Sequence, residues 1–265
     1  MTALAPTDGL PQPQRRYAML AIMMGLAVAV LDTTIMNLAL PAITHELHAS
    51  APEAIWLVNA YQIASLVLLL PLATLGDIVG YRRVYLAGAA LFSVASLGAV
   101  ASTSLEHLIA ARTLQGVGAA GIMSVNSALG RLIYPRAQLG RGLALNSMTV
   151  AVSSVAGPSV AAAILSVGSW PWLFAINLPL GAVVLALGWR ALPHNPAKAA
   201  NARISVVDVL LNILMFSLVF VAADQLGTHE GGAHANALAA WLMLAAGIAV
   251  GVVYALQLFG VLKPG

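Results

Sequence analysis

The chain has 265 residues, of which 60% are hydrophobic and only 8% are charged, and its formal net charge is +3. Soluble globular domains carry about 25% charged residues, so this chain has too few polar side chains to cover a water-facing surface. The composition excludes a soluble enzyme, a disordered chain and a nucleic-acid-binding protein, and it predicts an integral membrane protein. Because cysteine is absent, disulfide bonds and thiolate metal sites are excluded as well.

Eight apolar segments follow one another along the chain, and each is long enough to cross about 30 Å of hydrocarbon as a helix. They cover residues 17–41, 54–75, 84–102, 107–130, 142–167, 170–189, 204–226 and 238–260. Short polar connections marked by Gly or Pro separate them, which is typical of a compact helical bundle. The sequence therefore predicts an all-α integral membrane protein with eight spans.

The basic residues predict the orientation, because Lys and Arg concentrate in cytoplasmic loops of membrane proteins. If residues 1–16 form a cytoplasmic tail, eleven of the twelve basic residues lie on the cytoplasmic side, including those of a linker at 191–203 and an end segment at 261–265. They are Arg15, Arg16, Arg82, Arg83, Arg131, Arg136, Arg141, Arg190, Lys198, Arg203 and Lys263. We expect a multi-pass protein of the plasma (inner) membrane whose positive charge contacts anionic lipid rather than nucleic acid.

One acidic residue, Asp32, lies inside the first span, about nine residues or ~13 Å from its outer end. A carboxylate at such a depth costs on the order of 2.5–3.5 kcal/mol to insert, so its side chain should face protein or water. Asp32 is therefore a candidate to take up and release a proton. The alternative is a structural partner for a buried cation.

One basic residue, Arg112, lies within the fourth span, about 8–9 Å from the outer end. The first and fourth spans run in opposite directions, so Asp32 and Arg112 should lie at similar depth and can pair. Gln115 follows one turn later on the same helix face. Because desolvation can exceed the Coulomb gain of a buried pair, we expect the pair to link protonation of Asp32 to helix movement rather than to add stability.

Two motifs of soluble proteins occur and are rejected. Residues 116–121 (GVGAAG) match a dinucleotide-binding fingerprint, but they lie within a membrane span, where small residues allow close helix packing. His229, Glu230 and His234 resemble part of a zinc-protease helix, but their spacing is one residue too long for two ligands on one helix face. We expect no metal and no cofactor.

Gly157 and Pro158 interrupt the fifth span. Proline removes a backbone hydrogen bond and kinks a helix where neighbouring groups compensate. The pair is either a passive packing feature or a pivot for movement, and the physical argument alone leaves both open.

Five segments resemble signatures of the major facilitator superfamily, in its fourteen-helix drug/proton antiporter branch. In chain order they are residues 31–41 (LDTTIMNLALP), 75–83 (LGDIVGYRR), 112–118 (RTLQGVG), 157–158 (GP) and 170–181 (WPWLFAINLPLG). They follow the order of the family over the first ~180 residues. The resemblance implies a six-helix N-terminal bundle at residues 17–190 and two further transmembrane helices at 204–260.

The resemblance also implies functional roles. Asp32, Arg112 and Gln115 would couple transport to protons, while Gly157 and Pro158 would form the antiporter motif. Asp77, Gly80, Arg82 and Arg83 would close the cytoplasmic side. The expected activity is proton-coupled efflux of a small hydrophobic or cationic compound across the lipid bilayer.

The length adds a further expectation. Eight spans use about 30 residues each, so fourteen would need well over 400, and the sequence is expected to be an N-terminal piece that needs a missing second half or a second copy. The alternative is a truncated, non-transporting membrane protein that is inert or binds partner subunits. Proton-coupled uptake is a variant of the first hypothesis. An intramembrane enzyme would need a converging nucleophile and base or metal ligands, and no His lies in mid-span.

Overall fold

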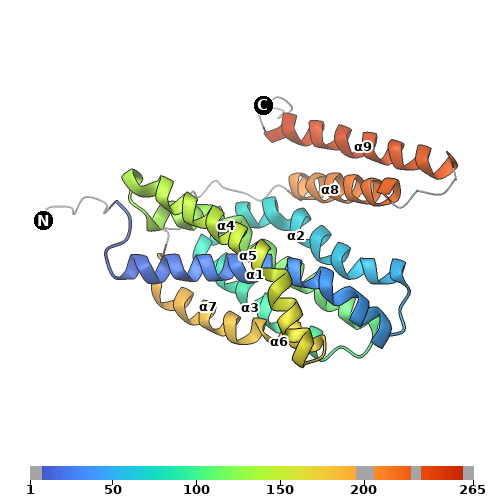
Figure 1. Ribbon diagram of the computed structural model, residues 1–265. Coiled ribbons are helices and arrows are strands. Elements are labelled where there is room, and N and C mark those ends of the chain that lie inside the picture. The colour runs from blue at the N-terminus through green and yellow to red at the C-terminus, as the bar shows by residue number, and fades with distance from the viewer. Residues whose placement is uncertain (1–7, 195–205, 228–233, 259–265) are drawn as a thin grey trace, which may run out of the picture.

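The computed structural model describes residues 8–194, 206–227 and 234–258, and these form helices joined by short connections (Figure 1). The helices are α1 (Gln14–Glu46), α2 (Ala51–Val79), α3 (Tyr81–Val100), α4 (Leu105–Ile133), α5 (Leu139–Val167), α6 (Pro171–Ala175), α7 (Asn177–Ala191), α8 (Val206–Gly227) and α9 (His234–Leu258), with a short 3₁₀ turn η1 (Arg136–Gln138) before α5. The expectations for Lys198, Arg203, His229, Glu230 and Lys263 lie outside the described residues.

The all-helical architecture with eight spans is confirmed, and one detail is corrected. The sixth span is two helices, α6 and α7, separated at Ile176, although together they form one apolar segment, Pro171–Ala191. Among the described residues, six segments are long and apolar enough to cross a membrane, while α8 and α9 contain shorter apolar stretches, Val209–Ala223 and Leu238–Val253. Mean hydropathy cannot detect the break, because apolar residues continue on both sides of it.

The connection between α2 and α3 consists of one residue, Gly80. Its φ angle of 105° lies in the region that only glycine adopts without strain, which explains the glycine at this position. At the opposite end of α2, Ser50 and Glu53 form a reciprocal capping box that satisfies the first free amides of the helix. These features fix where α2 begins and ends.

Helices α1 and α4 are the most buried spans, whereas α2 and α5 present most of their surface outward. Helix α4 packs very closely on α3, because a Cβ atom on Gly118 or Gly121 would meet the α3 backbone at 2.6 to 2.8 Å. Gly88 on α3 makes the matching approach. The interpretation of residues 116–121 as a packing motif is therefore confirmed.

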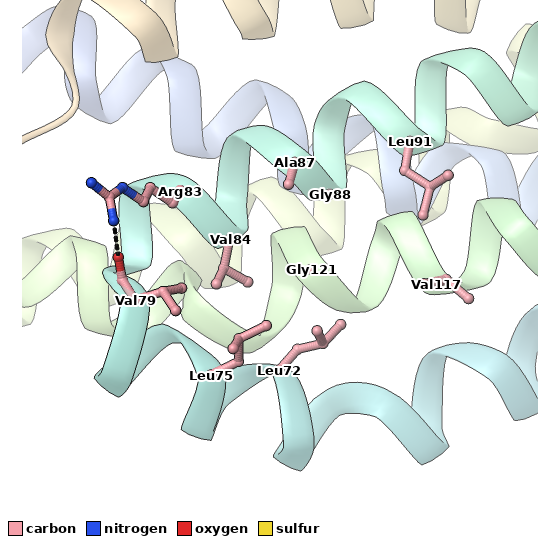
Figure 2. Close-up of a pocket in the computed structure, with 10 residues that line it drawn as sticks. All are labelled: Leu72, Leu75, Val79, Arg83, Val84, Ala87, Gly88, Leu91, Val117 and Gly121. Carbon is pink, nitrogen blue, oxygen red and sulfur yellow. Dashed lines mark hydrogen bonds between the residues drawn. The ribbon is translucent and has the colours of Figure 1, made fainter. Parts of the chain in front are cut away.

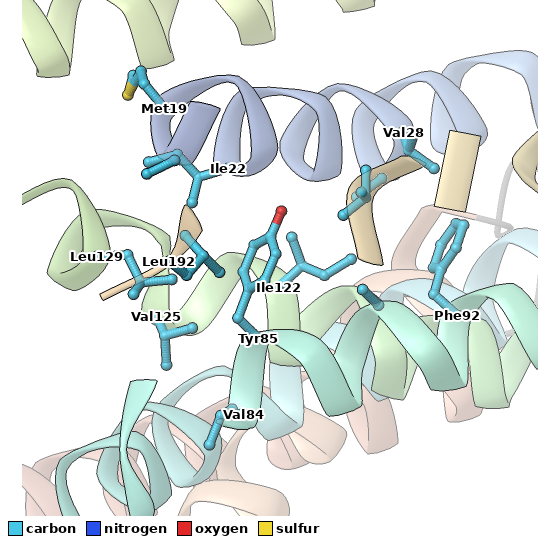
Figure 3. Packing of buried hydrophobic residues seen from close by; sticks show 14 of the residues in the cluster. Met19, Ile22, Val28, Val84, Tyr85, Phe92, Ile122, Val125, Leu129 and Leu192 are labelled. Carbon is cyan, nitrogen blue, oxygen red and sulfur yellow. The ribbon is translucent and has the colours of Figure 1, made fainter. Parts of the chain in front are cut away.

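A hydrophobic cluster joins the N-terminal half of α1 to α3, α4 and α7 (Figure 3). Tyr85 lies at its centre, fully buried, with its ring between Ile22 and Ile122. Its hydroxyl donates a hydrogen bond to the carbonyl of Ala21 at 2.7 Å, so the polar atom is satisfied inside the apolar cluster. This cluster fixes α1 relative to α3 and α4.

Helices α8 and α9 pack against each other beside α2 (Figure 1). Gly247 and Gly251 on α9 let it approach α8 at Val219 and Met215. The contacts of this pair with the rest of the described chain run mainly through α8 and α2. The first seven helices therefore form the bundle that holds the predicted site.

Candidate functional site

Asp32 on α1 and Arg112 on α4 meet in the interior of the bundle. Only 3% of Asp32 and none of Arg112 is exposed. The Arg112 Nη1 atom donates to Asp32 Oδ2, and this is the one ion pair found within the described residues. The structure thus brings together the two charged residues that the sequence places at similar depth.

Neutral groups from three helices complete the surroundings of the Arg112 guanidinium. Its Nη1 donates to Gln115 Oε1 at 2.9 Å, and its Nε donates to the carbonyl of Leu57 on α2 at 3.2 Å. The guanidinium carbon lies 4.3 Å from the ring centre of Tyr61 and 5.8 Å from that of Phe174. These contacts replace part of the hydration that the guanidinium loses within an apolar bundle.

The second oxygen of Asp32 accepts from two amides. Asn177 Nδ2, at the start of α7, donates to Asp32 Oδ1 at 2.8 Å, and Gln115 Nε2 donates to the same oxygen at 3.4 Å. Gln115 Nε2 also donates to the Ser96 hydroxyl at 2.8 Å. Arg112, Gln115 and Asn177 all donate to the Asp32 carboxyl, which is the arrangement that suits an ionised, acceptor-only carboxylate.

Three residues of this network were not predicted as site residues from the sequence: Asn177, Ser96 and Tyr61. Asn177 belongs to the segment that resembles the sixth-helix signature, so its position in that motif was a usable signal. Ser96 and Tyr61 carry no such signal, because single Ser and Tyr residues are common in membrane helices. Tyr61 is held in place by a hydrogen bond from its hydroxyl to the carbonyl of Ala29 at 3.1 Å.

Gly157 and Pro158 lie on α5 where it packs against α1. Gly157 is buried, and a Cβ atom there would overlap the hydroxyl of Thr34, which lies two residues from Asp32. Pro158 is exposed, and α5 continues through it from Leu139 to Val167. The absence of a side chain at 157 therefore allows α5 to approach the helix that carries the buried carboxylate.

The residues predicted to close the cytoplasmic side lie at the α2–α3 connection, where Gly80, Arg82 and Arg83 line one cavity and Asp77 does not. Asp77 is exposed and accepts from the Tyr81 hydroxyl. Arg82 turns toward the end of α7, where it bonds with the Trp189 carbonyl and the ring of His194, while Arg83 donates to the carbonyl of Val79 at 3.4 Å. Asp77, Arg82 and Arg83 therefore lie close together in the chain, but their side chains bond to different neighbours.

Within the part of the chain that the structure describes, three or more His, Asp or Glu side chains do not converge on a point where they could hold a metal ion. The site is therefore a buried charge pair enclosed by amide and hydroxyl groups. Such an arrangement can bind and release a proton and can respond to the change of charge by moving a helix.

The sequence profile described as Major Facilitator Superfamily matches residues 22–262. The uncharacterized transporter YebQ of Escherichia coli is 52% identical over 215 residues, which cover 81% of this chain and 47% of that protein. The methylenomycin A resistance protein of Streptomyces coelicolor is 33% identical over 251 residues, 92% of this chain and 52% of that protein. Further relatives are named as resistance or multidrug export proteins.

Among solved structures, the POT family transporter PepTSo superposes with a TM-score of 0.64 at 15% sequence identity, over 94% of this chain and 54% of that one. This similarity concerns the fold. The chain spans about half the length of the curated relatives it matches. The profile match over nearly the whole chain, together with the named relatives, places this chain in the Major Facilitator Superfamily.

Proposed function

We propose that this chain is the N-terminal part of a proton-coupled antiporter of the plasma (inner) membrane, with its N-terminus in the cytoplasm. It would expel small hydrophobic or cationic compounds against the entry of protons. The observation that carries the proposal is the buried Asp32–Arg112 pair in an otherwise apolar bundle. Ionisable residues inside membrane spans are costly to insert and commonly serve ion or proton pathways.

In this mechanism Asp32 is the proton carrier. With Asp32 ionised, Arg112, Gln115 and Asn177 hold its two oxygens and tie α1 to α4 and α7. A proton arriving on Asp32 removes the negative charge, so Arg112 loses its counter-ion and the hydrogen bonds weaken. Helices α1 and α4 then shift, and loss of the proton on the other side of the membrane restores the original contacts.

Two other groups of residues would serve the movement. The α2–α3 connection, with Asp77, Gly80, Arg82 and Arg83, is proposed to close the cytoplasmic side. The close approach of Gly157 to Thr34 supports a role for Gly157 and Pro158 as a pivot, because it couples α5 directly to the helix of Asp32.

The proposed transport requires a second helical half. Transporters built from such repeats bind substrate near the midplane, between two halves that rock against each other. The curated relatives are about twice as long as this chain, which supports a second half in the same polypeptide. A second copy of this chain is the other possible source.

The test uses the protein expressed at its full native length in everted membrane vesicles with a pH indicator inside. Adding a lipophilic cationic dye to energised vesicles should release protons from the interior. Asp32→Asn should abolish the release, whereas Glu106→Gln, which neutralises an exposed carboxylate outside the network, should retain it. Proton-dependent transport by Asp32→Asn would reject the carrier role, and membrane insertion without proton movement for any compound would favour the non-transporting alternative.

A further inference from the structure

Two cavities lie next to each other at the α2–α3 end of the bundle. The first is an apolar groove of about 260 Å³ between α2, α3 and α4, lined by side chains that include Leu72, Leu75, Leu91 and Val117 (Figure 2). Its floor is the close crossing of α3 and α4 at Gly88 and Gly121, where the two helix backbones lie in contact. The apolar lining of the groove suits a hydrocarbon chain.

The second cavity, of about 520 Å³, lies between α3 and the end of α7 and is basic. Arg82, Arg83 and His194 line it together with Trp189. The guanidinium carbon of Arg82 lies 5.5 Å from the centre of the Trp189 ring, and the Nε atom of Arg82 is buried without a hydrogen-bond partner. The described lining residues include two arginines and no Asp or Glu, so the charged side chains that line this cavity attract an anion.

The start of α3 adds to this attraction. Gly80 lines the basic cavity and is the N-cap of the 20-residue helix α3, without a side chain that caps its first amides. The N-terminus of a helix carries free N–H groups and a partial positive charge, both of which favour an anion. Two arginines, one tryptophan and a helix N-terminus thus surround the same space.

The two cavities join at Arg83 and Val79, which line both of them. Figure 2 shows the Arg83 guanidinium at one end of the groove, with Val84, Ala87 and Leu91 following along α3. Farther along the same helix, 67% of Val94 and 55% of Leu97 is exposed, so the outward surface of α3 stays apolar. A molecule with an anionic head and an apolar tail matches this order of charge and hydrophobicity.

We propose that these two cavities form a binding site for one anionic phospholipid, with the phosphate group held by Arg82 and Arg83 and one acyl chain lying in the groove of Figure 2. Trp189, 71% exposed, would lie at the level of the headgroup, where interfacial tryptophans are enriched. A soluble phosphate would use only the basic cavity. The apolar groove joined to it therefore favours a lipid, and the site does not depend on the transport activity proposed above.

The experiment measures quenching of tryptophan fluorescence in the purified full chain, reconstituted in phosphatidylcholine vesicles with a small fraction of phosphatidylglycerol brominated on its acyl chains. A parallel sample carries Trp189→Phe, so the difference between the two reports Trp189 alone. Quenching of Trp189 should exceed that given by the same fraction of brominated phosphatidylcholine. A basic residue near an anionic lipid surface contributes about fivefold in affinity, so Arg82→Ala and Arg83→Ala should each lower the apparent affinity by about that factor.

Two controls separate the site from general attraction. Arg141→Ala removes an exposed charge from the same end of the bundle but lines neither cavity, so it should leave the quenching unchanged. Ala87→Phe fills the groove without altering charge and should weaken phosphatidylglycerol binding severalfold. Because this variant retains both arginines, its effect also shows whether the groove takes the acyl chain.

Several results would overturn the proposal. Equal quenching by brominated phosphatidylcholine would mean that the site has no preference for an anionic head. Equal losses in Arg141→Ala and Arg83→Ala would reduce the effect to net charge. Displacement of the lipid by millimolar inorganic phosphate, with no effect of Ala87→Phe, would assign the basic cavity to a soluble anion. Loss of quenching only when the chain self-associates would assign the groove to a second copy.

Discussion

Asn177 donates a hydrogen bond from Nδ2 to Asp32 Oδ1 at 2.8 Å, across 145 positions of sequence. Asn177 is the first residue of α7, directly after the break at Ile176, so the start of this helix is attached to the buried carboxylate. A change of charge on Asp32 therefore acts on α7 as well as on α4.

Replacing Asn177 should destabilise the bundle. A hydrogen bond to a charged group contributes about 1.5–3 kcal/mol, so Asn177→Ala should lower the free energy of unfolding by about this amount. Thermal unfolding in detergent measures the loss. Asn146→Ala is a matched control, because the side-chain oxygen of Asn146 is buried without a hydrogen-bond partner. Equal stability of Asn177→Ala and the wild-type protein would contradict the described bond.

Removing one member of the ion pair should cost more than removing both. Arg112→Leu leaves Asp32 as an unpaired buried carboxylate and should destabilise the protein by about 3–5 kcal/mol. In Asp32→Leu/Arg112→Leu, neither charge is left without a partner, so this double variant should unfold at a higher temperature than either single variant. Additive losses in the double variant would show that the two side chains do not interact.

Tyr61 makes two contributions that can be separated, one through its ring and one through its hydroxyl group. Tyr61→Phe keeps the ring over the Arg112 guanidinium and loses only the hydrogen bond to Ala29. Tyr61→Leu loses the ring as well, and a cation–π contact contributes about 0.5–2 kcal/mol. We therefore expect a lower unfolding temperature for Tyr61→Leu than for Tyr61→Phe, and the reverse order would argue against the cation–π contact.

A side chain at position 157 should force α5 away from α1. The methyl group of Gly157→Ala overlaps Thr34, and overpacking of this kind costs about 1–3 kcal/mol. Gly140→Ala, on the same helix, meets only open space and should be neutral or slightly stabilising. Thr34→Ala combined with Gly157→Ala should recover part of the loss. A Gly157→Ala variant as stable as Gly140→Ala would contradict the close approach.

The sequence predicts the Asp32–Arg112 pair because a charge in a membrane span is rare and its depth follows from counting residues at 1.5 Å each. The same counting cannot find Asn177 or Ser96. Neutral polar side chains cost little free energy to insert into a membrane span, so they also occur where there is no functional site. The arginines after Gly80 are another example. Their place in the sequence is plain, yet the direction in which Arg82 turns depends on where α7 ends.

The break at Ile176 lies where Pro179 predicts one. Proline has no backbone N–H to donate to the carbonyl of Ala175, four residues earlier, and its ring crowds that carbonyl. Asn177 then reaches Asp32 from the first turn of the new helix. Hydropathy alone gives only the length of the whole segment, because it does not register a missing hydrogen bond.

The limited contact of α8 and α9 with the bundle has a consequence for their removal. Because this helix pair rests mainly on α2, we expect its deletion to expose one flank and to leave the core around Tyr85 and the Asp32 network intact. Substitutions on α8 and α9 should therefore cost the bundle less stability than substitutions on α1 and α4.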